Sequence, residues 1–178
     1  MKHRTKTSAL SVLAILVGSA ALSAQTATVT QGGDSSSSIG VGMNYWVSLN
    51  DIDIDDIDDN GFSYLVSYQY RPGFLGFELV GEYFPDRFGD DAWAPEAYVI
   101  VGEGLYGAAG IGVVNSGGSF EDEPFFALKL GFDVKVIANL RLDVSANYRF
   151  NDTAELDDDD TKIDSDTVFL GATLRLGF

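Results

Sequence analysis

The acidic residues of this chain are its main candidates for binding chemistry. Residues 56–61 read Asp-Ile-Asp-Asp-Asn-Gly and match the first half of a calcium-binding loop, D-x-[DN]-x-[DN]-G. The twelfth position of such a loop should hold a bidentate glutamate, but Ser67 stands there, inside a predicted strand. We therefore interpret residues 56–61, and the second acidic run at 157–160, as solvated loop. Weak binding of divalent cations by the crowded loop carboxylates stays open as the alternative.

Residue types needed for most enzymatic chemistry are missing from the sequence. It contains no cysteine, which excludes disulfides, thiol chemistry and cysteine-based metal sites. Its one histidine is His3, in the basic N-terminal segment, so the rest of the chain offers no imidazole as a general base or metal ligand. We predict a protein that is not an enzyme, with no catalytic residues, no metal centre and no cofactor.

The N-terminus has the layout of a secretory signal peptide. A basic segment precedes an apolar run over residues 9–17, and small residues follow up to Ala24. The apolar run is too short to cross about 30 Å of hydrocarbon as a helix. We predict a signal peptide over residues 1–24 and a polar, Ser/Gly-rich linker over residues 25–38.

The rest of the chain, residues 39–178, reads as alternating strands. Val168 to Phe178 is the clearest case, because its even positions are apolar and its odd positions carry Gly171, Thr173, Arg175 and other residues. Two of the strands are apolar on both faces, so periodicity does not predict which of their side chains face the lipid. The predicted strands cover residues 39–50, 62–70, 74–84, 94–101, 105–114, 125–136, 140–150 and 168–178, those without a phase being 94–101 and 105–114.

The connections between these strands alternate between tight turns and long loops. The tight ones lie at residues 71–73, 102–104 and 137–139, and the long ones at 51–60, 85–92, 115–124 and 151–166. Short turns at one end and long loops at the other are typical of an outer-membrane barrel. We predict an all-β fold, an eight-stranded antiparallel up-and-down transmembrane β-barrel with lipid on its apolar face.

Charge separates sharply along this topology. Without the predicted signal peptide, 8 basic residues stand against 27 acidic ones, a net charge of −19 that makes nucleic acid an unsuitable partner. The four long loops hold 20 of the acidic residues. The strands hold a nearly balanced set on their non-lipid faces, and Trp46 is also predicted to point inward. We expect pairing across the interior among Glu78, Glu82, Lys129, Asp133, Lys135, Arg141, Asp143, Arg149 and Arg175.

These features resemble the small outer-membrane β-barrel family of the OmpA-barrel, OmpX/Ail and OmpW-like type. The resemblance covers residues 39–178 and includes Leu174-x-Leu176-x-Phe178, similar to the C-terminal signal read by the outer-membrane assembly machinery. It implies a bacterial outer-membrane location, with membrane lipid and lipopolysaccharide as partners and the assembly machinery contacting Phe178. Divalent cations at the acidic loops are a further expected partner. Enzymes of such barrels use a histidine that this chain lacks after His3.

The sequence leaves three functions open. The favoured one is a structural or surface-interaction role, with acidic loops meeting the cell exterior. The first alternative is a narrow, porin-like channel or a route for small hydrophobic molecules. The second is a soluble, secreted, lipocalin-like binding barrel, which should not carry apolar residues on the outside of residues 125–178.

Overall fold

The computed structural model describes residues 36–49, 60–85, 91–116, 119–120, 123–155 and 162–178. The predicted signal peptide and most of the predicted linker lie outside these residues. Within the described part of the chain no helix is long and apolar enough to cross a membrane. The described elements are all β-strands.

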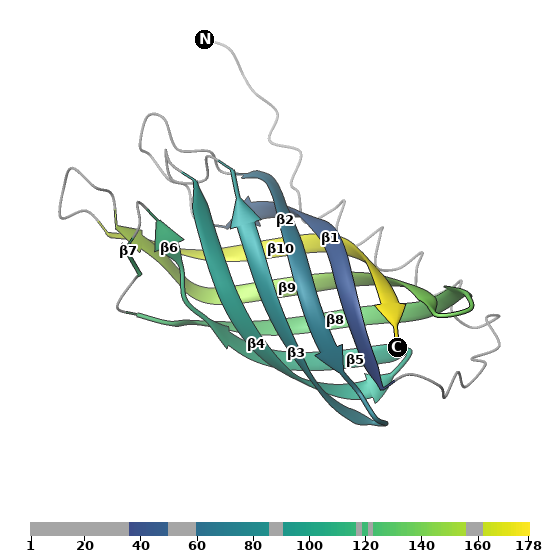
Figure 1. The fold of residues 1–178 in the computed structure, drawn as a ribbon. Coiled ribbons are helices and arrows are strands. Elements are labelled where there is room, and N and C mark those ends of the chain that lie inside the picture. The colour runs from purple at the N-terminus through teal and green to yellow at the C-terminus, as the bar shows by residue number, and fades with distance from the viewer. Residues whose placement is uncertain (1–35, 50–59, 86–90, 117–118, 121–122, 156–161) are drawn as a thin grey trace, which may run out of the picture. The chain divides into compact units, whose positions relative to one another are not determined.

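Eight long antiparallel strands close into a barrel, as predicted (Figure 1). Each strand pairs with its neighbours in sequence, and β1 pairs with β10 to close the circle. A short hairpin of β6 and β7 extends from the edge of β4. The strands are β1 Ser37–Ser48, β2 Asn60–Tyr70, β3 Leu75–Phe84, β4 Ala92–Glu103, β5 Leu105–Gly112, β6 Asn115–Ser116, β7 Ser119–Phe120, β8 Phe125–Ile137, β9 Leu140–Glu155 and β10 Lys162–Gly177.

Side-chain alternation along the strands separates an apolar exterior from a polar interior. On β10, Leu174 and Leu176 are 49% and 51% exposed, whereas Arg175 between them is 2% exposed. The structure also shows which side chains face inward on the two strands whose periodicity did not predict it. β4 turns Glu96 and Tyr98 inward, and β5 turns Tyr106 inward.

Three tight turns connect strands at one end of the barrel, which we call the turn end; the opposite end is the loop end. All three lie where the sequence predicted them, between β2 and β3, β4 and β5, and β8 and β9. The β4–β5 turn depends on Gly102 and Gly104, whose φ angles are 121° and 65°. A Cβ on Gly102 would lie 2.6 Å from the carbonyl oxygen of Leu105, so a side chain is disfavoured by both conformation and contact.

The prediction of one long loop over residues 151–166 is wrong in part. β9 continues to Glu155 and β10 begins at Lys162, and the two extensions pair with each other from Lys162 opposite Glu155 to Ser165 opposite Asp152. A register shift between Ser165 and Thr167 separates this ribbon from the regular barrel pairing. The extension has no apolar face in sequence, so periodicity gave no signal for it.

Replacing Gly102 with Ala should lower the free energy of unfolding by about 1–3 kcal/mol, because Ala is strained at this φ angle. Urea unfolding of the refolded barrel in lipid vesicles measures the change. Gly73→Ala is the matched control in another turn, where no atom lies within 4 Å of an added Cβ. Equal losses in the two variants would contradict the assignment of strain to Gly102.

Candidate functional site in the barrel interior

Charged and polar side chains occupy much of the barrel interior. They come from inward positions of all eight long strands, and the buried charged ones are at most 4% exposed. Groups so buried need partners, because an uncompensated charge in a low-dielectric interior is costly. The buried charged residues are Glu78, Glu82, Glu96, Asp133, Asp143, Arg149 and Arg175.

Arg149 organises the polar group nearest the loop end. Its guanidinium pairs with Glu82 on β3, across the barrel from β9, and with Glu96 on β4, where Nη2 lies 2.7 Å from Oε1. Asn44 donates to Glu82 Oε1 at 2.5 Å, and Ser63 donates to the same oxygen. The Glu82 carboxylate therefore accepts hydrogen bonds from three other strands, which fixes its position in the interior.

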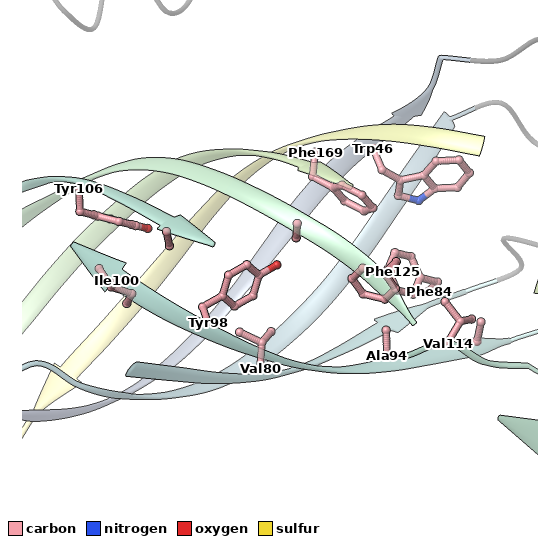
Figure 2. Close-up of a cluster of buried hydrophobic side chains, with 13 residues drawn as sticks. Trp46, Val80, Phe84, Ala94, Tyr98, Ile100, Tyr106, Val114, Phe125 and Phe169 are labelled. Atoms are coloured by element: carbon pink, nitrogen blue, oxygen red, sulfur yellow. The ribbon is translucent and has the colours of Figure 1, made fainter. Parts of the chain in front are cut away.

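Three phenylalanine rings surround the Arg149 guanidinium. Its central carbon lies 4.0 Å from the ring centre of Phe169, 4.7 Å from that of Phe125 and 5.3 Å from that of Phe84. Figure 2 shows these rings gathered with Trp46, which points inward as predicted. The rings exclude water from the ion pairs beside them and attract the cation through their faces.

A second group, centred on Arg175, occupies the middle of the interior. Its guanidinium pairs with Glu78 on β3 and lies 3.2 Å from Asp143 on β9. Lys129 Nζ reaches Glu78 from β8 at 3.1 Å. The Tyr106 hydroxyl donates to Asp143, 3.0 Å from each carboxylate oxygen. This group joins strands on opposite sides of the barrel, as the first does.

The third group lies at the turn end, around Asp133. Arg71 Nη2 is 2.7 Å from Asp133 Oδ2, and Arg141 Nε is 2.8 Å from Asp133 Oδ1. Arg71 follows β2 and Asp133 lies on β8, four strands away in either direction around the barrel. The Arg71–Asp133 pair thus joins opposite walls of the interior.

The first two groups leave little free space between them. A cavity lined by Glu78, Glu82, Glu96, Lys129 and Arg175, among others, measures about 10 Å³, room for about one water molecule. The interior at this level is filled by side chains. A wide aqueous path does not pass through it.

Arg141 and Asp143 form ion pairs only with residues of neighbouring strands. The predicted pairing across the interior is confirmed for the other residues of the set except Lys135. That residue is exposed at the turn end, next to a register shift in the β8–β9 pairing, and no described residue forms an ion pair with it. Sequence reasoning missed two members. Glu96 lies on a strand whose phase periodicity did not give, and Arg71 was assigned to a turn, where no alternation predicts its direction.

The metal-binding alternative receives no support from the described residues. Residues 56–59 and 157–160 lie outside them, so most of the calcium motif is untested, but its last two positions, Asn60 and Gly61, lie in β2 and not in the predicted loop. Ser67, at its twelfth position, lies in β2 as predicted and accepts a hydrogen bond from Arg175 Nη1 at 2.9 Å. Among the described side chains, no group of three or more acidic, His or Cys residues is arranged to hold a metal ion.

Comparison with solved structures identifies the same architecture. Neisserial surface protein A matches with a TM-score of 0.63 and 18% identity, over 81% of this chain and 98% of that one. OprG from Pseudomonas aeruginosa matches with a TM-score of 0.49 and 15% identity, over 83% and 99% of the two chains. Ail from Yersinia pestis gives 0.42 and 21%, over 80% and 100%. No family model and no curated protein matches the sequence.

The likeness to Neisserial surface protein A confirms the predicted fold, that of the small eight-stranded outer-membrane barrels. At 18% identity it carries the fold alone. The function depends on the exterior, interior and loops of this chain and not on the shared fold.

Replacing Arg149 with Met should destabilise the barrel by about 3–5 kcal/mol, because Glu82 and Glu96 lose the cation that both contact. Urea unfolding in lipid vesicles measures the loss. Adding Glu82→Gln and Glu96→Gln to the Met variant should recover much of it, since the amides remove the unpaired negative charges. A Met variant as stable as the parent, or no recovery in the triple variant, would contradict this account.

Proposed function

We propose that this protein is a non-enzymatic barrel of the bacterial outer membrane with a structural or surface-interaction role. The observation that carries the proposal is the combination of an apolar exterior with an interior filled by paired charges. The N-terminal segment, residues 1–24, serves as the export signal. The acidic long loops then meet the cell exterior.

An apolar belt around the barrel supports the membrane location. One outward residue from each long strand illustrates it, with exposed fractions from 43% to 62%. Soluble proteins rarely expose an apolar surface of this extent, whereas lipid covers it at no cost. A soluble lipocalin-like barrel requires the opposite arrangement on β8, β9 and β10. The illustrative residues are Val41, Val66, Leu79, Val99, Ile111, Leu128, Val144 and Leu174.

The filled interior supports a structural role over a channel. The Arg149 and Arg175 groups join walls of the barrel that face each other, and about 10 Å³ stays free beside them. An ion moving through the interior would have to separate buried pairs, each of which is costly to break. A surface role places the binding chemistry in the long loops and the β9–β10 extension, which together hold 20 acidic residues.

Fractionation of the cell envelope tests the location. The protein should be extracted from the outer membrane by detergent, and its migration on gels should change on boiling, because folded barrels resist unfolding in detergent. Recovery as a soluble secreted protein would refute the membrane proposal and restore the lipocalin-like alternative.

Single-channel recording in planar bilayers tests the filled interior. The wild-type barrel should show no conductance. Steady conductance from the intact, purified barrel would favour the channel alternative instead.

The surface role is tested in the fourth loop. Changing all four residues 157–160 from Asp to Asn keeps the length of the chain and removes four charges. This variant should fold normally and lose much of the wild-type binding of divalent cations, lipopolysaccharide or other surfaces. Wild-type binding that persists undiminished in the variant would remove the fourth loop from the proposal.

A further inference from the structure

The turn end of the barrel interior carries more positive than negative charge. Asp133 is shared by Arg71 and Arg141, so one carboxylate serves two guanidinium groups. Lys135 lies directly opposite Arg141 in the β8–β9 register, and like charges in this position repel each other. Glu103, also near this end, is exposed at an outward position of β4 and does not offset the excess.

Two buried donors in this region have no hydrogen-bond acceptor in the part of the chain that the structure describes. Arg71 has a side chain only 9% exposed, and its Nη1 finds no hydrogen-bond partner among the described residues. Gln69 is 3% exposed, and its Nε2 is likewise unpartnered. The two residues are two positions apart at the turn-side end of β2. A buried donor without an acceptor is destabilising, and a charged one more so, so an acceptor bound here would stabilise the barrel.

The excess charge is within reach of solvent at this end. Lys135 is exposed, and the Arg141 side chain is 28% exposed. Both lie beside the tight β8–β9 turn, and Arg71 approaches Asp133 from the opposite wall. A ligand entering from the turn end therefore meets Lys135 and Arg141 before the buried donors of Arg71 and Gln69.

We propose that this cluster, formed by Arg71, Arg141, Lys135 and Gln69, is a binding site for a phosphate group. A tetrahedral oxyanion offers several acceptor oxygens at once, and guanidinium groups bind it through paired charge-assisted hydrogen bonds. The phosphate belongs either to a soluble anion or to the headgroup of a phospholipid at the adjacent membrane surface. The site is separate from the surface role proposed for the loops, which lie at the opposite end.

Nuclear magnetic resonance on the ¹⁵N-labelled full barrel, refolded in a maltoside detergent free of phosphorus, tests the site. Inorganic phosphate should shift the side-chain signals of Gln69 and of the Arg71 Nε in a saturable manner. Short-chain phosphatidylglycerol forms the second arm, with the diacylglycerol of the same chain length as its phosphate-free control. Saturation in the first arm alone identifies a soluble anion, and tighter saturation by phosphatidylglycerol identifies a headgroup.

Variants decide whether the named residues form the site. Arg71→Gln and Lys135→Gln should each weaken phosphate binding about tenfold or more, since each removes a charged donor. Lys162→Gln removes the same charge from the loop end of β10 and should leave the affinity unchanged. Lys135 is exposed, so its variant keeps the test valid if Arg71→Gln fails to fold.

Two results would overturn the proposal. The first is the absence of saturable shifts with both phosphate and phosphatidylglycerol, which would mean that water alone satisfies the buried donors. The second is an equal loss of phosphate affinity in Lys135→Gln and Lys162→Gln. Binding would then reflect nonspecific attraction of the anion to positive charge anywhere on the barrel. Either result would leave the membrane location and the role of the loops untouched.

Discussion

The structure depends on one constraint, that a charge buried inside a narrow barrel must find its partner on another wall. Among the described residues, the ion pairs of the interior join five cations to five carboxylates. Glu78 is shared by Arg175 and Lys129, and Arg149 contacts both Glu82 and Glu96. Because most of these pairs cross the interior, they fix the distance between strands that have no backbone hydrogen bonds with each other.

Whether an interior cation is arginine or lysine follows how deeply the group is buried. Arg149, between three aromatic rings, has a planar and weakly hydrated head that both stacks on a ring and reaches carboxylates on two strands. Lys129 lies over Tyr98, with Nζ 4.0 Å from the ring centre, and reaches a single carboxylate. The loop end of the interior is therefore drier than the turn end, where Arg141 is partly exposed.

Much of this arrangement could be predicted from the sequence, because a strand in this fold has one apolar and one polar face. The alternation of β8, β9 and β10 gave both the strands and most of the paired charges. Alternation gave no prediction where the sequence does not show which side chains face inward. Glu96 lies on a strand that is apolar on both sides, and Arg71 follows the last residue of its strand, so only tertiary packing decides where each side chain points.

The crossing pairs also constrain the order in which the barrel forms. Arg149 and Glu82 are 67 residues apart in the chain, and Arg175 and Glu78 are 97 apart. Both pairs join β3 to a strand near the end of the chain, β9 or β10, so a half-formed sheet entering the bilayer would present unpaired charges to hydrocarbon. Contacts of such long range form slowly. Closure of the circle and entry into the lipid are therefore best accomplished as a single concerted step, and the charges that stabilise the finished barrel raise the barrier to its premature insertion.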